Sequence, residues 1–203
     1  MQSIRSINGR ARVALVTAAA LLLLPAACGD ETSHDGRPGP VTDHFDQESR
    51  HNDADIAFLQ GMIPHHRQAV EMAALAESRA RNADVKMLAE QIKLVQAAEI
   101  TQLNAWLTEW NAPVPSPAAA VHGQHDTVPG MATEQKLADL ENAEGAEFDR
   151  AFLEMMIGHH EGARQMAVTE QREGQHPGVR ELATRIEKAQ GNEIEQMRRT
   201  QAN

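Results

Sequence analysis

Apolar residues recur every three or four positions through most of the chain after residue 53, which places them on one face of an α-helix. Stretches rich in proline, glycine and polar residues precede this pattern at 29–50 and interrupt it at 111–132. Capping residues and helix breakers set the expected ends of the helices. The pattern predicts helices over about 53–81, from Asn82 or Asp84 to about 110, and over about 133–142, 146–173 and 177–199.

The second half of the helical region repeats the first half. Residues 55–73 align with 149–167 without a gap, and both copies contain Phe-Leu-x-x-Met-Ile-x-His-His. A single helical hairpin cannot bury its apolar stripe, whereas two hairpins can cover each other. The repeat therefore predicts an all-α fold, a four-helix bundle over 51–203. It consists of hairpin one at 52–110, a linker at 111–132 and hairpin two at 133–202.

The histidine pair of each copy lies along the inward stripe of its helix. With about 100° of rotation per residue, His65 and His66 straddle the stripe that contains Met62, while Gln68 mostly points away. The second copy repeats this arrangement. Some inward positions carry side chains that could bind a metal. They are Asp55, Met62, His65, His66 and Met72 in the first copy, and Asp149, Met156, His159, His160 and Met166 in the second.

The partner helix of each hairpin carries polar residues on its apolar face. Gln96 and Glu99 share a stripe with leucine and isoleucine, and Gln190 and Glu193 repeat them. A buried carboxylate without a partner is costly. We expect each glutamate to accept a hydrogen bond from a histidine N–H on the facing helix, which would leave the other ring nitrogen free for a metal.

A helix breaker precedes each histidine pair. Pro64 removes a backbone donor and Gly158 occupies the same register in the second copy. These residues predict a kinked or loosened turn that aims the following histidines. The alternative is that Pro64 simply begins the helix, but the inward stripe already runs through the residues before it.

Composition reduces the number of functional classes that fit this chain. The net charge of −10 argues against nucleic acid and anionic membrane surfaces as partners. Aromatic residues make up only 3% of the chain, so the core must consist of Ala, Leu, Ile and Met. The nine methionines are flexible core fillers and also soft thioether ligands. No nucleophile–base pair is evident, which favours binding over catalysis and leaves enzyme activity an open question.

The N-terminus predicts export. Three arginines precede an apolar run at 13–24, which is too short for a comfortable membrane span and typical of a signal peptide at 1–27. The sole cysteine, Cys28, resembles the lipidated residue of bacterial lipoproteins, although Pro25 stands where Leu is usual. An ordinary secretory signal cut nearby is the alternative. We expect an extracytoplasmic protein, attached to the membrane only by lipid at Cys28 through a flexible tether at 28–50.

The duplicated Met and His-His constellation is a more specific signal than one histidine would be. It favours a metal site over purely structural histidines. Thioether plus imidazole suits Cu(I), while Cu(II) stays open. Zn(II) rarely uses Met, and Ca(II) and Mg(II) prefer oxygen. The predicted helices carry no Glu-x-x-His, which disfavours a ferritin-type di-iron centre.

The motif Phe-Leu-x-x-Met-Ile-x-His-His, followed by Ala-x-x-Met-Ala and later Gln-x-x-Glu-Ile, resembles the bacterial domain-of-unknown-function family number 305, which includes CopM-like copper-binding proteins. The resemblance covers about 50–203. It implies a ferritin-like four-helix bundle in an exported protein. The implied copper ligands are Met62, His65, His66, Met156, His159 and His160. Additional ligands or supporting residues would be Asp55, Met72, Glu99, Asp149, Met166 and Glu193.

These observations predict an exported lipoprotein that binds and buffers copper or hands it on. The expected partners are metal ions, with a copper-trafficking protein or a second copy of the chain as further candidates and nucleic acid excluded. A metal-dependent oxidase is one alternative. An interaction module in which the histidines are structural or sense pH is the other.

Overall fold

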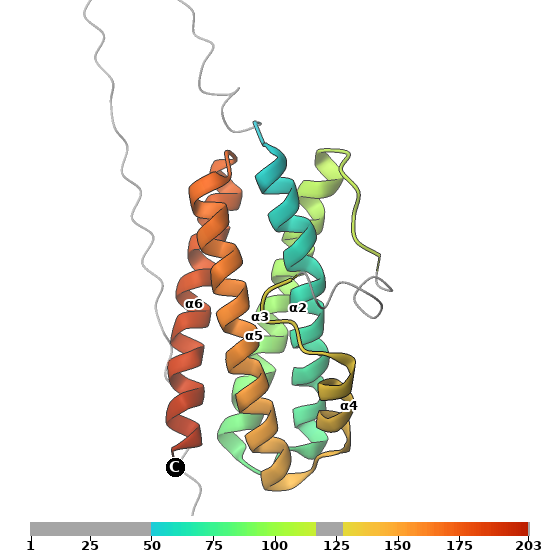
Figure 1. Ribbon diagram of the computed structural model, residues 1–203, viewed down its shortest axis with the longest axis vertical. Helices are drawn as coiled ribbons and strands as arrows, with labels where there is room; N and C mark the ends of the chain where they lie inside the picture. The colour runs from blue at the N-terminus through green and yellow to red at the C-terminus, as the bar shows by residue number, and fades with distance from the viewer. Residues whose placement is uncertain (1–49, 117–127, 203) are drawn as a thin grey trace, which may run out of the picture. The chain divides into compact units, whose positions relative to one another are not determined.

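The computed structural model describes residues 50–116 and 128–202, which form five helices (Figure 1). The signal peptide and Cys28 lie outside these ranges, so export and lipidation stay predictions. No helix in the described part is long and apolar enough to cross a membrane. The helices are α2 (Asp53–Arg79), α3 (Ala83–Glu109), α4 (Glu134–Asn142), α5 (Gly145–Glu173) and α6 (Pro177–Gln201).

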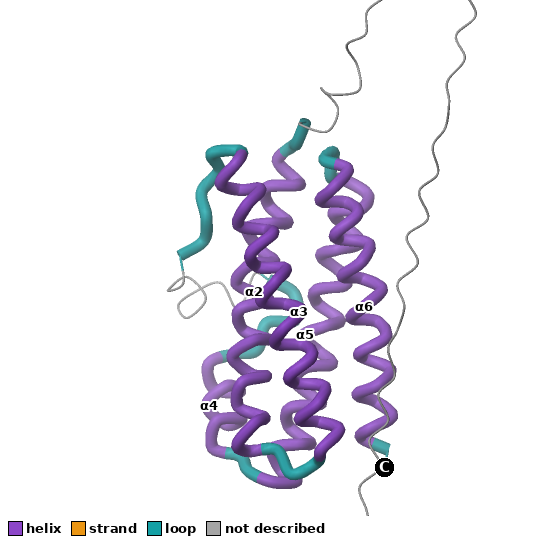
Figure 2. The backbone as a smooth tube through the Cα atoms, turned by 180° about the vertical axis from the view of Figure 1, so that it is seen from behind, coloured by secondary structure: helices purple, strands orange, loops and turns teal. Residues whose placement is uncertain are grey.

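Four long helices form the bundle, as predicted. α2 packs against α3 and α5 packs against α6, and the two hairpins meet mainly where α2 lies beside α5. Figure 2 shows the four helices running roughly parallel to one long axis, with the short α4 to one side. α4 contacts both α2 and α5. The predicted duplicated hairpins are therefore the two halves of the molecule.

Side-chain caps begin α2, α3 and α4 close to the predicted positions, and His176 caps α6. Asn52 and Asp55 form a capping box at the start of α2, and Asn82 and Thr133 accept backbone N–H groups at the starts of α3 and α4. These bonds satisfy donors that a helix start leaves without a partner. Pro64 lies inside α2, so the alternative that it begins the helix is wrong.

An aspartate in each hairpin holds the turn of the other hairpin. Asp149 of α5 accepts the N–H groups of Arg81 and Asn82, at 3.1 and 2.9 Å. Asp55 of α2 accepts those of Gln175 and His176, at 3.1 and 3.0 Å. We expected both aspartates to assist a metal site. These backbone bonds account for their positions at the ends of the helices without a metal.

The apolar core falls into two clusters along the bundle. One contains Phe148, Phe152 and Met156, together with residues of α2, α3, α4 and α6. The other contains Phe58 and Met62, together with residues of α3, α5 and α6. The buried histidines of α2 and α5 follow Met62 and Met156 by one turn, and thus lie between the clusters.

Candidate metal centre

Four imidazoles form a buried layer in the middle of the bundle. His65 and His66 on α2 and His160 on α5 are 0% exposed, and His159 is 1% exposed. Adjacent residues on one helix point about 100° apart, so the rings of each pair separate, with centroids at 6.5 Å in α2 and 6.4 Å in α5. Both members of each predicted pair are therefore removed from solvent.

The two repeats meet through one imidazole from each. The ring centroids of His65 and His159 are 3.7 Å apart, and the ring planes are inclined by 37°. This contact joins α2 to α5 where the hairpins face each other. It brings together two ligands that we predicted from separate copies of the motif.

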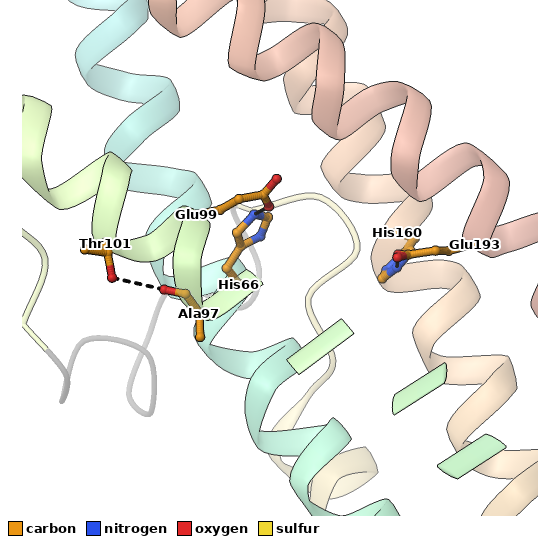
Figure 3. Close-up of polar contacts among 6 residues, drawn as sticks. All are labelled: His66, Ala97, Glu99, Thr101, His160 and Glu193. Atoms are coloured by element: carbon orange, nitrogen blue, oxygen red, sulfur yellow. Dashed lines mark hydrogen bonds and ion pairs between the residues drawn. The ribbon is translucent and has the colours of Figure 1, made fainter. Parts of the chain in front are cut away.

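The outer imidazole of each pair binds a glutamate, as we expected. His66 Nε2 lies 2.7 Å from Glu99 Oε2, and His160 Nε2 lies 2.7 Å from Glu193 Oε2 (Figure 3). An ionised carboxylate only accepts hydrogen bonds. The proton therefore sits on each Nε2, and the Nδ1 lone pairs are free.

These glutamates lie where the layer approaches solvent. The side chains of Glu99 and Glu193 are 16% and 12% exposed, whereas their histidine partners are fully buried. Partial hydration reduces the cost of keeping each carboxylate charged. The pairs thus lead from the buried rings towards the surface through α3 and α6.

A segment of the linker covers His65. The carbonyl oxygen of Pro129 lies 3.1 Å from His65 Nε2, so this ring also carries its proton on Nε2. The Gln68 amide donates to the carbonyl of Ala132 at 2.9 Å and accepts its N–H at 2.7 Å. The prediction that Gln68 points away from the interior is wrong, because the linker returns over α2 and buries it.

Glycine lets this segment approach α5 closely. A Cβ on Gly162 would lie 2.1 Å from the Pro129 carbonyl oxygen, and a Cβ on Gly130 would lie 2.9 Å from the carbonyl oxygen of His159. Gly130 also has a φ of +80°, which other residues rarely adopt. The sequence signal that could have revealed this cover is Pro-Gly at 129–130, which we interpreted only as part of a linker.

The imidazoles of His65 and His159 are held neutral. Burial lowers the pKa of His65 to about 3, with further lowering from the nearby His66 and His160. Burial also lowers the pKa of His159 well below its usual value, assisted by His65. Neutral rings retain a lone pair at ordinary pH, which is the form that binds metals.

The predicted methionines flank this layer. Met62 and Met156 are both 0% exposed and belong to opposite core clusters, each three residues before the first histidine of its pair. Residues three and four apart on a helix are neighbours on its surface. Met72 is buried in one cluster and Met166 packs at the edge of the other, as core filler would.

Several polar atoms of the layer have no hydrogen-bond partner within the described residues. They are Nδ1 of His65, His66 and His160, both ring nitrogens of His159, and the side-chain amides of Gln96 and Gln190. Buried polar atoms normally have partners. The unpaired nitrogen lone pairs are suited to a cation.

The donor set suits a soft ion rather than a hard one. No group of three or more His, Cys, Asp or Glu side chains in residues 50–116 and 128–202 is arranged to hold a metal. A harder ion such as Zn(II) would need such a group. Cu(I) also accepts thioether sulfur, which Met62 and Met156 could supply beside the imidazoles.

Comparison with known proteins supports the assignment of the chain as a four-helix bundle. The family model described as Domain of unknown function (DUF305) matches residues 55–201. The uncharacterized protein L153 of Acanthamoeba polyphaga mimivirus is 38% identical over 55 residues, which are 27% of this chain and 36% of that protein. The match thus spans about a third of the relative's length.

Solved structures share the fold at greater coverage. A DUF305 fragment from Deinococcus radiodurans is 32% identical, with a TM-score of 0.66 over 73% of this chain and 95% of that one. A Streptomyces coelicolor DUF305 protein assigned as secreted is 30% identical, with a TM-score of 0.64 over 71% and 89%. CopM in its Cu(I)-bound form is 32% identical, with a TM-score of 0.60 over 71% and 93%. CopM is also known in Cu(II)- and Ag-bound forms.

Proposed function

This chain belongs to the DUF305 family, and from that premise we propose that it binds copper, chiefly Cu(I), in its buried imidazole layer. The observation that carries the proposal is the contact of His65 with His159, both neutral and both with an unpaired Nδ1. The Cu(I)-, Cu(II)- and Ag-bound forms of CopM give independent support.

Two kinds of residue would hold the ion. The imidazoles of His65 and His159 are the central donors, and the thioethers of Met62 and Met156 are the soft donors on either side. His66 and His160 have their Nε2 protons held by Glu99 and Glu193. Their Nδ1 atoms would join the site only if the rings moved, because no three such side chains in the described residues are arranged around one ion. Bound copper would act as a soft Lewis acid, and the protein would shield it from water.

Storage or transfer fits this layer better than catalysis. The covering segment and the apolar clusters leave the central imidazoles shielded from water. The low pKa of His65, about 3, lies far below the range in which a pH sensor would operate, so the pH-sensing alternative has no support at this residue. An oxidase would be recognised by oxygen consumption when Cu(I) is added.

The predicted leader and the comparison with a protein assigned as secreted support an extracytoplasmic location. We propose that Cys28 carries lipid and tethers the bundle. Mass analysis of the protein purified from its native cell would detect the lipid on Cys28, and an unmodified N-terminus beginning after another residue would exclude it.

Copper titration tests the central proposal. Purified protein should remove Cu(I) from a chromophoric chelator, and a variant with all four motif histidines changed to Ala should lose this ability. Because that variant empties part of the core, Met62→Leu with Met156→Leu is the milder companion, and Met87→Leu on the exposed face of α3 is its control. Equal copper binding by the wild type and a folded four-histidine variant would refute the proposal.

A further inference from the structure

A groove on the surface beside the imidazole layer exposes two further thioethers. It lies between α4 and α5, has a volume of about 510 Å³, and is lined by Met131 and Met155 among others. In Figure 1, α4 lies beside the lower part of α5. Both methionines are partly exposed. Neither belongs to the ligand set proposed above.

The groove borders the segment that covers the imidazoles. Met131 directly follows Gly130, whose Cβ, if it had one, would lie 2.8 Å from the carbonyl oxygen of Gly158. Met155 precedes His159 by one helical turn on α5. Gly130 and Gly158 line the same groove. The Pro129–Gly130 segment thus contacts the ring of His65 through Pro129 and borders the groove through Gly130.

The chemistry of the groove selects for a soft cation. Thioether sulfur is a neutral, polarizable donor that prefers ions such as Cu(I) and Ag(I) over hard cations. The lining also contains acidic residues Asp139, Glu147 and Glu154 and basic residues Lys136 and Arg150. Because these charges nearly cancel, electrostatic attraction alone would not concentrate an ion here. Selectivity would come from the sulfur atoms.

Core packing explains the position of Met155 better than that of Met131. Met155 packs against the core cluster that contains Phe148 and Phe152, whereas Met131 is not among the residues that form or border either cluster. Met131 nonetheless sits on a segment anchored on both sides, by Pro129 to His65 and by Ala132 to Gln68. A thioether is therefore fixed beside the groove where packing does not require it.

We propose that Met131 and Met155 form an outer site that receives a soft monovalent cation, Cu(I) or Ag(I), before it reaches the buried imidazoles. This inference rests on the proposed function. The ion exchanges water for thioether sulfur at the surface, and then thioether for imidazole nitrogen, with no change in oxidation state. The covering segment Pro129–Ala132 must move away from the imidazoles during the second exchange.

Ag(I) is the suitable probe because it is not oxidised by air and reports soft-ligand binding. The full chain is labelled with ¹³C at methionine methyl groups and ¹⁵N in the histidine rings, and Ag(I) is added below one equivalent. The Met131 and Met155 methyl signals should shift at the earliest times after mixing, before the His65 and His159 ring signals. The Met87 methyl on α3 should not move.

Met131→Leu combined with Met155→Leu keeps the apolar volume and removes both sulfur atoms. This variant should load the imidazoles more slowly than the wild type while reaching the same final imidazole shifts, and Met87→Leu should load at the wild-type rate. Unaltered loading in the double variant, or unmoved Met131 and Met155 methyl signals while the imidazoles fill, would overturn the outer site and leave the proposed function standing.

The remaining outcomes separate the two proposals. Ag(I) that shifts Met131 and Met155 but never the imidazole signals would support the outer site and refute the buried one. Ag(I) that shifts neither set would refute both. The unfolding transition of each variant, measured alongside, shows whether the substitutions have altered the fold.

Discussion

At the scale of single residues, a buried imidazole binds a metal only when it is neutral and presents an unpaired nitrogen. Burial meets the first condition for His65 and His159, whose pKa values are lowered. Hydrogen bonds to Pro129, Glu99 and Glu193 meet the second for His65, His66 and His160 by placing protons on Nε2, and His159 has both ring nitrogens unpaired. The hydrogen-bond partners of the rings therefore decide, together with burial, which ring nitrogens can bind a metal.

Glu99→Ala should weaken binding of Cu(I) or Ag(I) by roughly 10- to 100-fold, which is typical when a metal-binding histidine loses the carboxylate that orients it. His66 would lose its 2.7 Å partner and with it the preference for a free Nδ1. Competition with a chelator of known affinity measures the change. Glu90→Ala, on the same helix but paired at the surface with Lys93, should leave the metal affinity unchanged. An equally large loss of affinity in that variant would show that the effect comes from charge alone.

Two glycines of α5 provide a matched pair. Gly162→Ala should destabilise the fold by about 1–3 kcal/mol, because its Cβ would collide with the Pro129 carbonyl. Gly158→Ala meets no atom within 4 Å and should stabilise the helix by up to about 1 kcal/mol. Denaturant titration gives both free energies. If the two variants shift stability in the same direction, the close approach of the covering segment does not constrain α5.

At the scale of secondary-structure elements, the two hairpins hold each other's turns through Asp55 and Asp149. An additional carboxyl group, Glu170 near the end of α5, is 1% exposed and interacts with Asp55. Burial and the neighbouring Asp55 raise the pKa of Glu170 to about 8. Burial would also raise the pKa of Asp55, but hydrogen bonds from Asn52, Glu170 and the turn outweigh it and lower that pKa.

The raised pKa of Glu170 predicts a loss of stability as the pH rises from 4.5 to about 8. Between the ordinary pKa of 4.5 and about 8, the folded protein keeps a proton that the unfolded chain releases. The contribution is therefore complete below pH 4.5 and is lost as the pH rises through about 8. Glu170→Gln should flatten this decline in the free energy of unfolding. Glu173→Gln, which changes an exposed neighbour, should retain the wild-type slope, and an equal slope in all three proteins would contradict the assignment.

At the scale of the whole molecule, neither hairpin is complete by itself. Met62 and His65 of hairpin one are covered by hairpin two and its linker, and Asp149 supplies acceptors for the Arg81 and Asn82 N–H groups. The polar layer also depends on both copies, because its central contact joins His65 to His159.

Residues 50–116 alone should therefore not form a cooperatively folded monomer. Circular dichroism and sedimentation of this fragment, with and without residues 128–202, measure the effect. We expect partial helix in the fragment and a sharp unfolding transition once both halves are mixed. A stable monomeric hairpin with a cooperative transition of its own would show that the halves are independent.

The helices and their pairing follow from local sequence. Apolar spacing, the caps at Asn52 and Thr133, and the exact repeat of the histidine motif predict the α-helical bundle and the helix limits to within a few residues. The glutamates on the apolar stripes also predict their histidine partners, because an isolated carboxylate on such a stripe needs a nearby donor. These features depend on residues close together in the chain or on a repeated pattern.

Only the tertiary structure decided which imidazoles meet and what covers them. The contact between His65 and His159 depends on how α2 lies against α5, which helical periodicity does not specify. The burial of Gln68 and the use of Pro129 as a partner depend on the path of a linker that has no periodic pattern. Asp55 and Asp149 share the inward stripe with the histidines, but the lengths of the opposing hairpins place the turns, rather than a metal, within their reach.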